Sequence, residues 1–228
     1  MLLDGKKALV TGGSRGIGFE ISKHFLEYGV NVLAISRDPG KLAQAEDALP
    51  GLHILQADVS IADDNDRIAA WIQANWGVLD ILVNNAGVYP TTGRILSGVS
   101  DEEFEQTIKI NVLGPYYCTK RLLPLLFKSE DPRVVNVGSR SGLMSSGLSG
   151  AYSVSKVALH ALTIAMANEL KGEIAVNALC PGWVRTDMAP DAPGDPRISA
   201  EAALWVVNQA SEITGRLFNG KIEINWSA

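Results

Sequence analysis

A tyrosine and a lysine stand four residues apart at the start of an apolar segment, Tyr152-Ser153-Val154-Ser155-Lys156. In a helix, this spacing puts both side chains on one face. An ammonium beside a phenol stabilises the phenolate, so the pair predicts a tyrosine pKa below its ordinary value of about 10. Such a tyrosine can exchange a proton with a carbonyl or alcohol oxygen, which is general acid–base chemistry. By itself such a pair is common and is usually only a contact on a helix surface.

A glycine-rich turn near the N-terminus could hold a phosphate group. The run from Thr11 to Gly18 reads TGGSRGIG, follows an apolar segment and precedes a helical pattern. Glycines allow a sharp turn and let a pyrophosphate approach backbone N–H groups at a helix N-terminus, where the dipole favours negative charge. The alternative is a tight turn that uses glycine for steric reasons alone. The predicted contacts are Gly12, Ser14, Arg15, Gly16, Ile17 and Gly18.

The end of the second predicted strand is where the adenosine ribose of a dinucleotide should lie. An acidic residue there accepts hydrogen bonds from the ribose diol and repels a 2′-phosphate. This chain has Ser36 and Arg37 at that place, followed by Asp38. Arg37, helped by Arg15, can pair with a doubly charged phosphate, so the sequence predicts NADP(H) over NAD(H). In the alternative interpretation, Arg37 is solvated and Asp38 binds the ribose.

Three further motifs follow in order along the chain. They are Asn84-Asn85-Ala86-Gly87 after the fourth predicted strand, Ser139 thirteen residues before Tyr152, and Pro181-Gly182 after the sixth strand. Together with the glycine run and the tyrosine–lysine pair, they resemble the short-chain dehydrogenase/reductase family over nearly the whole chain. The resemblance implies one NAD(P)-binding domain of the α/β Rossmann type over residues 1–228, with about seven mostly parallel strands.

The resemblance also implies roles for individual residues. Tyr152 would protonate a carbonyl oxygen or deprotonate an alcohol, while Lys156 would hold the nicotinamide ribose and tune Tyr152. Ser139 would hydrogen-bond the substrate oxygen, and Asn111 would help hold a water that relays protons to Lys156. The other implied cofactor contacts are Asp58 and Val59 at the adenine, Asn85, Ala86 and Gly87 along the cleft, Pro181 and Gly182 after the sixth strand, and Val184 and Thr186 at the nicotinamide carboxamide.

Several of these residues also have simpler interpretations. Ser139 could cap a turn beside Ser141, and an asparagine in mid-helix such as Asn111 could bond only to backbone. Asn84 is expected to brace the sheet and not to touch a ligand. The histidines lie in unrelated segments without triad or metal-ligand spacing, so we interpret them as structural and predict no metal site. They are His24, His53 and His160.

These residues must be positioned by elements that alternate along the chain. Short β-branched runs predict strands at 7–11, 30–36, 52–57, 80–84, 133–138, 175–179 and 221–224. Longer patterns between them predict helices at 16–28, 39–49, 63–76, 101–127, 152–170 and 199–209. Such alternation predicts a doubly wound sheet with helices on both faces and right-handed crossovers.

The composition sets outer bounds on the function. The chain has 228 residues, 46% hydrophobic and 20% charged, which suffices for one domain with a sizeable core. With a net charge of -5 and no long basic run, a nucleic-acid partner is not expected. Cys118 and Cys180 are interpreted as buried thiols, with a disulfide as the alternative. The N-terminus has no signal-peptide pattern and is too short for a membrane span, so we expect a cytoplasmic protein without membrane contact.

Two predicted helices, 101–127 and 152–170, carry apolar residues on more than one side. The apolar residues of the second helix do not fall on one stripe; they are Val154, Val157, Leu159, Leu162, Ile164, Met166 and Leu170. A helix that is apolar on several faces must be covered on several faces. We therefore expect a homodimer or homotetramer through these helices, with burial by a neighbouring loop as the alternative.

The substrate is the part of the function that the sequence describes least. Residues 187–212 form the predicted substrate lid, which is short and implies an open pocket. Its expected apolar wall is Leu143, Met144, Trp183 and Met188. The C-terminal segment looks more like the carbonyl-reductase branch of the family, although the long insertion of the animal enzymes before the catalytic tyrosine is missing. The predicted reaction is NADPH-dependent reduction of a small ketone or aldehyde; the alternatives are reduction of a 3-oxoacyl-carrier-protein substrate and a non-catalytic NADP-binding sensor.

Overall fold

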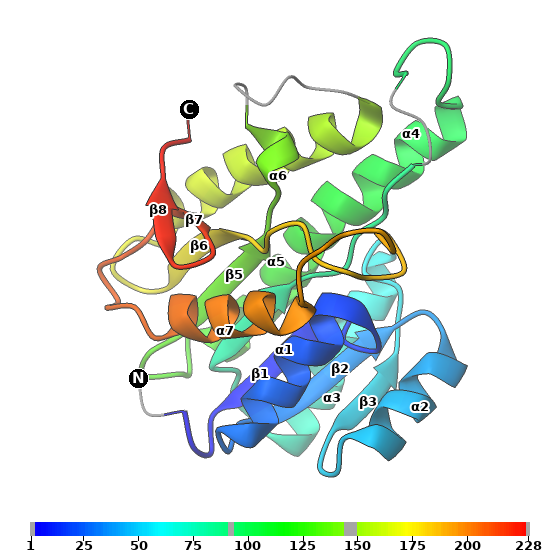
Figure 1. Cartoon of the computed structure of the whole chain (residues 1–228). Coiled ribbons are helices and arrows are strands. Elements are labelled where there is room, and N and C mark those ends of the chain that lie inside the picture. The colour runs from blue at the N-terminus through cyan, green and yellow to red at the C-terminus, as the bar shows by residue number, and fades with distance from the viewer. Residues whose placement is uncertain (1–2, 91–93, 144–149, 227–228) are drawn as a thin grey trace.

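The computed structural model describes residues 3–90, 94–143 and 150–226. In these residues the strands form one eight-stranded sheet with the order β3-β2-β1-β4-β5-β6-β7-β8 (Figure 1). The strands are β1 (Lys7–Thr11), β2 (Asn31–Ser36), β3 (His53–Gln56), β4 (Ile81–Asn84), β5 (Arg133–Val137), β6 (Ala175–Cys180), β7 (Leu217–Asn219) and β8 (Ile222–Ile224). All neighbouring pairs are parallel except β7 and β8.

The central strands are buried on both faces, which is why they read as unbroken apolar runs. In β1, Ala8 and Val10 face one core while Leu9 faces the other. The chain runs from β1 outward to β3 and then returns to β4 on the other side of β1. Parallel sheets leave a crevice at such a reversal, outside the carboxyl ends of the strands, and ligands bind there.

Helices cover both faces of this sheet. They are α1 (Gly16–Glu27), α2 (Pro39–Ala48), α3 (Ala62–Asn75), α4 (Asp101–Ile108), α5 (Gly114–Leu126), α6 (Gly150–Glu169) and α7 (Pro196–Val207). Helices α1 and α7 lie side by side on one face, and α3, α5 and α6 pack on the other (Figure 1). No helix in the described ranges is long and apolar enough to span a bilayer.

The predicted helix 101–127 is not continuous. A π-helical turn, Lys109–Leu113, separates α4 from α5, and the backbone N–H of Gly114 donates to the carbonyl of Lys109. Pro115 has no N–H to offer the carbonyl of Asn111, so the regular α-helical pattern cannot run through this point. The other predicted helices are confirmed, with ends that shift by at most three residues.

The prediction also missed one strand. Residues Leu217–Asn219 form β7, parallel to β6, and Gly220 with a φ of 60° turns the chain back into β8. Strand β8 matches the predicted segment 221–224 but is antiparallel. Three residues are too short to display an alternating pattern, so β7 carries no signal that separates it from a loop.

Candidate active site

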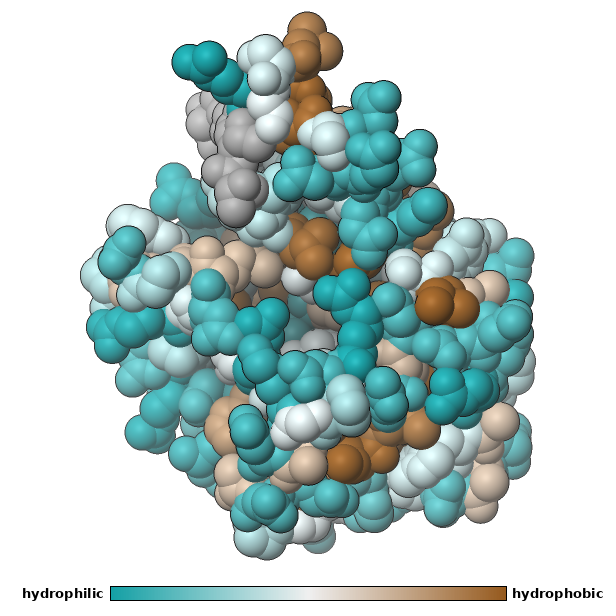
Figure 2. Space-filling view, turned by 90° about the vertical axis from the view of Figure 1, so that its right-hand side faces the viewer, coloured by the Kyte–Doolittle hydropathy of each residue, from teal (hydrophilic) through white to brown (hydrophobic). Residues whose placement is uncertain are grey.

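Two cavities adjoin at the carboxyl edge of the sheet. The first, the loop cleft, runs from the glycine run past Ser36 and Arg37 to the start of α6. The second, the lid pocket, has a volume of about 530 Å³ and lies between Ser139 and residues 181–192. The two cavities share part of their lining, namely Ile17, Gly138, Tyr152, Pro181, Thr186 and Met188. Figure 2 shows the side of the molecule on which Figure 1 has α2 and the loop before α7. This face is hollowed near its centre, and the rim of the hollow is mostly hydrophilic.

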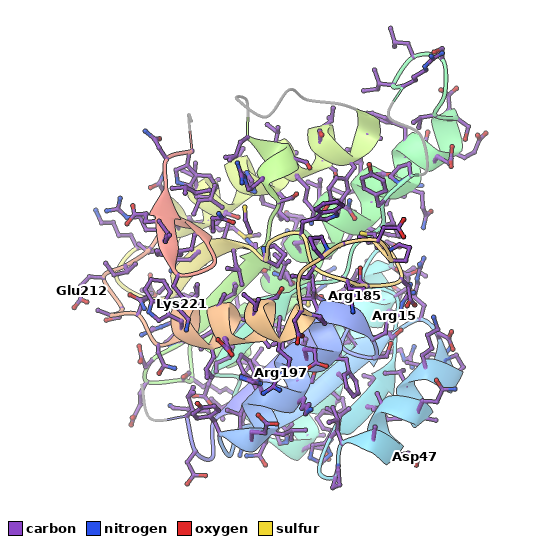
Figure 3. All side chains as sticks on the ribbon, viewed as in Figure 1. Arg15, Asp47, Arg185, Arg197, Glu212 and Lys221 are labelled. Atoms are coloured by element: carbon purple, nitrogen blue, oxygen red, sulfur yellow. The ribbon has the colours of Figure 1, made fainter. Side chains whose placement is uncertain are left out.

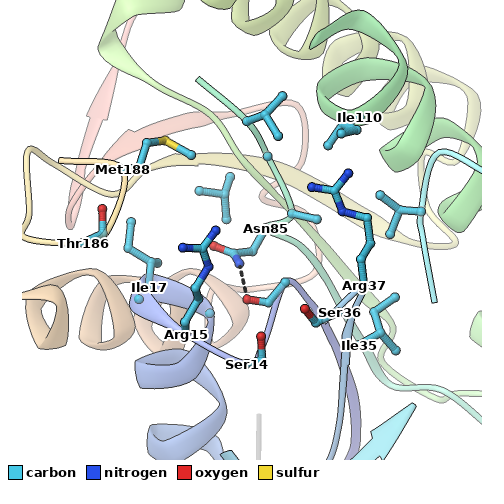
Figure 4. Close-up of a pocket in the computed structure, with 18 of the residues that line it drawn as sticks. Ser14, Arg15, Ile17, Ile35, Ser36, Arg37, Asn85, Ile110, Thr186 and Met188 are labelled. Atoms are coloured by element: carbon cyan, nitrogen blue, oxygen red, sulfur yellow. Dashed lines mark hydrogen bonds between the residues drawn. The ribbon is translucent and has the colours of Figure 1, made fainter. Parts of the chain in front are cut away.

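The glycine run forms the floor of the loop cleft. Gly12 and Gly16 have φ angles of 65° and 55°, which side chains rarely adopt. A Cβ on Gly18 would lie 2.3 Å from the backbone oxygen of Gly12, so only glycine fits where α1 meets the loop. All six residues predicted to contact a pyrophosphate line this cleft, and Figure 4 shows Ser14, Arg15 and Ile17 along it.

The N-terminus of α1 is open to a ligand. Helices α2, α4 and α7 begin with side chains that accept hydrogen bonds from their first-turn N–H groups: Asp38, Ser100 and Asp195. Helix α1 has neither such a cap nor an acidic residue in its first turn. Its free N–H groups and positive dipole end therefore fit the pyrophosphate of a dinucleotide.

The ribose end of the cleft carries the arginine that the sequence singled out. Ser36 and Arg37 line the cleft together with Asp58 and Val59, and a guanidinium nitrogen of Arg37 lies 3.7 Å from a carboxylate oxygen of Asp58. Asp38 is engaged elsewhere, because its Oδ1 accepts the backbone N–H of Lys41 at 3.1 Å as the cap of α2. The contacts therefore favour Arg37 over Asp38 as the side chain available to the ribose.

The two asparagines after β4 do different work. Asn85 lines the loop cleft and ties β4 to the glycine run. Its Nδ2 donates to the carbonyl of Thr11 at 2.8 Å and to that of Gly12 at 3.2 Å, the second of which is the dashed line in Figure 4. Asn84 is buried and donates to Asn136 Oδ1 at 2.8 Å and to Thr119 Oγ1 at 3.1 Å. The expectation that Asn84 braces the sheet is confirmed.

Ser139, Tyr152 and Lys156 meet where the two cavities join. The hydroxyl groups of Ser139 and Tyr152 share a hydrogen bond. Lys156 Nζ lies 5.5 Å from the centre of the Tyr152 ring and donates to the carbonyl of Val137 at 2.7 Å. Tyr89 packs edge-on against Tyr152 at 4.8 Å between ring centres. No motif in the sequence pointed to Tyr89, because it lies in a loop 63 residues before Tyr152.

The pKa of Tyr152 moves in the opposite direction to the one predicted. Burial raises it to about 12, although the hydrogen bond to Ser139 works against this. Burial likewise lowers the pKa of Lys156 to about 8. The prediction that Lys156 lowers the Tyr152 pKa was wrong, because the loss of water around the phenol outweighs the effect of an ammonium that donates to the Val137 carbonyl.

Asn111 lies behind the site and lines neither cavity. Its side chain bonds both backbone groups of Val88, accepting the N–H at 2.9 Å and donating to the carbonyl at 3.0 Å. It also donates to Ser155 Oγ at 3.0 Å. A Cβ on Gly87 would lie 3.3 Å from Asn111 Oδ1 and 3.9 Å from Lys156 Nζ, so Gly87 sits between these two side chains.

His160 contacts the site although the sequence pattern gave it no place there. Its Nε2 accepts the backbone N–H of Ser139 at 3.4 Å, and its ring packs edge-on against Trp226. A Cβ on Gly138 would lie 2.4 Å from Nε2 of this histidine. The imidazole therefore supports the backbone that carries Ser139. The spacing of His160, one helical turn after Lys156, was the only available signal.

The remaining predicted residues divide between the two cavities. Ala86 and Gly87 line the loop cleft, Gly182 and Val184 line the lid pocket, and Pro181 and Thr186 line both. Of the predicted apolar wall, Trp183 and Met188 line the lid pocket. Leu143 is instead buried in a small core cluster beside β6 and β7, because it follows the turn at Arg140–Gly142 inward. Met144 lies outside the described residues.

The fold and the site together define a class of protein: a Rossmann-type oxidoreductase with a Ser–Tyr–Lys group beside its dinucleotide cleft. The family model for short chain dehydrogenases matches residues 6–196. The chain therefore belongs to the short-chain dehydrogenase/reductase family, as the motifs predicted.

Curated relatives and solved structures cover almost the whole chain. A rhamnolipids biosynthesis 3-oxoacyl-[acyl-carrier-protein] reductase of Pseudomonas aeruginosa is 38% identical over 88% of this chain and 82% of the relative. A 3-oxoacyl-[acyl-carrier-protein] reductase FabG of Chlamydia muridarum is 33% identical over 96% of both. A Pseudomonas aeruginosa RhlG/NADP active-site complex is 32% identical and superimposes with a TM-score of 0.85 over 95% of each chain.

Proposed function

We propose that the protein reduces a carbonyl group to an alcohol with NADPH, with Tyr152 as the proton donor. The observation that carries the proposal is the position of Tyr152, which lines both cavities and shares a hydrogen bond with Ser139. A dinucleotide in one cavity and a substrate in the other would therefore meet at this hydroxyl.

Each residue of the group has a defined task in this proposal. The reduced nicotinamide supplies a hydride when bound. Tyr152 holds a proton at neutral pH because burial raises its pKa to about 12, and it passes that proton to the carbonyl oxygen. Ser139 hydrogen-bonds the same oxygen and orients it toward Tyr152. Lys156 holds the nicotinamide ribose. Asn111 would help to hold a water that relays protons to Lys156.

The cofactor would be held by the residues that line the loop cleft. The glycine run and the open N-terminus of α1 fit the pyrophosphate, and Asp58 and Val59, which line the same cleft, would contact the adenine. Arg15 and Arg37 both line the cleft and favour a 2′-phosphate. We expect Arg37→Ala to raise the KM for NADPH much more than the KM for NADH; equal effects on both would contradict the preference for NADPH.

The direct test of the proton donor is Tyr152→Phe. The variant should keep its affinity for NADPH and lose about 10²- to 10⁴-fold in kcat. Tyr28→Phe is the matched control, because Tyr28 is exposed at the end of α1 and away from both cavities. Near-normal turnover by Tyr152→Phe with intact cofactor binding would refute the role.

Two substrate classes are candidates. The first candidate is a small ketone or aldehyde, which is favoured by the size of the lid pocket and by the carbonyl-reductase-like C-terminal segment. A 3-oxoacyl thioester is the second candidate, favoured by the names of the relatives at 38% and 33% identity. NADPH oxidation should be measured with ketones, aldehydes and a 3-oxoacyl thioester. The class with the highest kcat/KM identifies the substrate, and tight NADPH binding without any turnover would favour a sensor.

We also propose that residues 187–212 act as the substrate lid and that the chain forms a homodimer or homotetramer. Support for the assembly comes from α6, which carries half-buried Val154, Val157 and Ile164 outside the core clusters. A second copy could cover this apolar side, together with α4 and α5. Light scattering should therefore give the mass of a dimer or tetramer at micromolar concentration, and the mass of a monomer would refute the proposed assembly.

A further inference from the structure

One exposed carboxylate closes over the loop cleft. Asp187 follows Thr186 in the loop before α7, and its Oδ2 accepts a hydrogen bond from an Arg15 guanidinium nitrogen. The same oxygen lies 3.4 Å from Lys41 Nζ. Arg15 comes from the glycine run and Lys41 from the first turn of α2, so two cations from separate segments converge on one anionic atom. Figure 3 shows Arg15 beside the loop that carries Arg185.

This arrangement marks an anion site that the protein fills with its own side chain. The hydrogen bonds from Arg15 and Lys41 lower the pKa of Asp187, so the carboxylate is charged at neutral pH. Arg15 lines the loop cleft together with Arg37, and both side chains extend into it in Figure 4. An anion bound beside Arg37 would therefore meet the cations that Asp187 now occupies.

A phosphate should displace the carboxylate. All three side chains are solvent-accessible, and exposed ion pairs of this kind contribute little to stability. A phosphate monoester carries up to two negative charges and three acceptor oxygens, so it can engage both cations more strongly than one carboxylate oxygen does.

The carboxylate is also tied to the wall of the lid pocket. Thr186 and Ala189 exchange backbone hydrogen bonds of 3.3 and 3.0 Å, which makes Asp187 and Met188 the middle of a closed turn. Thr186, Met188 and Ala189 line the lid pocket. Release of Asp187 therefore removes the side-chain contacts that tie this turn to the glycine run and to α2.

We propose that Lys41 joins Arg15 as a specificity residue for the 2′-phosphate of NADP(H), and that Asp187 holds this place in the free protein as a built-in competitor. NADP(H) then releases the 186–189 turn, whereas NAD(H) leaves the ion pairs intact. This inference rests on the proposed preference for NADP(H). It adds a residue that the sequence patterns did not single out and links cofactor choice to the substrate pocket.

The test compares 2′,5′-ADP with 5′-AMP by calorimetry, because these probes differ only in the 2′-phosphate and need no turnover. Asp187→Asn should bind 2′,5′-ADP about two- to fivefold more tightly. Lys41→Gln should bind it about three- to tenfold more weakly, and neither variant should change the affinity for 5′-AMP. Asp187→Asn should increase the affinity for 2′,5′-ADP less in the Lys41→Gln background than in the wild type. Asp47→Asn, at the exposed end of α2 (Figure 3), and Lys171→Gln are the charge-matched controls.

Release of the turn has its own readout. Trypsin cleavage after exposed Arg185, followed by mass spectrometry, should speed up in the wild type with 2′,5′-ADP and not with 5′-AMP. Asp187→Asn should be cut at the faster rate without any ligand, while Asp47→Asn behaves as the wild type.

The outcomes separate this inference from the proposed cofactor preference. If Arg37→Ala selectively weakens 2′,5′-ADP but the Lys41 and Asp187 variants match their controls, the preference for NADP(H) stands and the inference is overturned. If wild type binds both probes equally, the preference itself fails and the inference fails with it. Weaker binding of both probes by Asp187→Asn would make its role structural and would also overturn the inference.

Discussion

The buried imidazole of His160 should make the protein sensitive to acid in a measurable way. Burial lowers the pKa of His160 to about 4 from its ordinary 6.5, and the nearby charge of Lys156 adds to the effect. His160 is 4% exposed, so solvent screens this shift little. The folded protein therefore keeps a neutral imidazole at pH values where the unfolded chain is already protonated.

The size and sign of the effect follow from this difference. Between pH 6.5 and pH 4 the unfolded state binds one more proton at this site, so the free energy of unfolding falls as the pH falls. A difference of about 2.5 pKa units corresponds to about 3 kcal/mol. The loss begins below the ordinary pKa of histidine and is complete near the folded pKa of about 4.

The perturbation is His160→Gln, which removes the titration and keeps a side chain able to accept the Ser139 N–H. Urea unfolding followed by circular dichroism should be measured from pH 4 to pH 8 for both proteins. Carboxylates titrate in both proteins, so their contribution cancels in the difference between the two free energies of unfolding. Any packing cost of the substitution appears at pH 8 as a constant offset between the two curves. The wild type should lose about 3 kcal/mol more than the variant on going from pH 7 to pH 4. Parallel curves would refute the reasoning, because they would mean that His160 titrates alike in the folded and unfolded states.

Three other substitutions test the packing that positions the site. Phe25→Ala in α1 removes a fully buried ring, so the free energy of unfolding in urea should fall by about 3–5 kcal/mol; a loss below about 1 kcal/mol would contradict the packing. Ser100→Ala removes the capping box with Glu103, where Ser100 Oγ accepts the Glu103 N–H at 3.2 Å, and should cost about 1 kcal/mol in the same assay. Gly18→Ala should cost about 1–3 kcal/mol and weaken NADPH binding, since its Cβ would lie 2.3 Å from the Gly12 carbonyl oxygen; unchanged binding would show that the loop can yield.

Much of the fold was visible in local patterns. The parallel strands are buried on both faces and separated by helical segments, so their order in the chain and their type could be read directly. The break at Lys109–Leu113 was not predicted from Pro115, because a single π-turn leaves segments with the helical period on both sides of it. Strand β7 was missed because three residues cannot show alternation.

The sequence by itself determined the family, the glycine run, and the spacing that brings Ser139 and Lys156 to Tyr152. These features depend on residues close in the chain or on motifs in a fixed order. Tertiary structure alone decided the remaining contacts. Tyr89 packs against Tyr152, His160 accepts the Ser139 N–H, and Asp187 bonds Arg15, which lies 172 residues earlier in the chain. Tertiary structure also decided the pKa of Tyr152, because the removal of water around a side chain is a property of the whole packed fold and not of the three residues that separate it from a lysine.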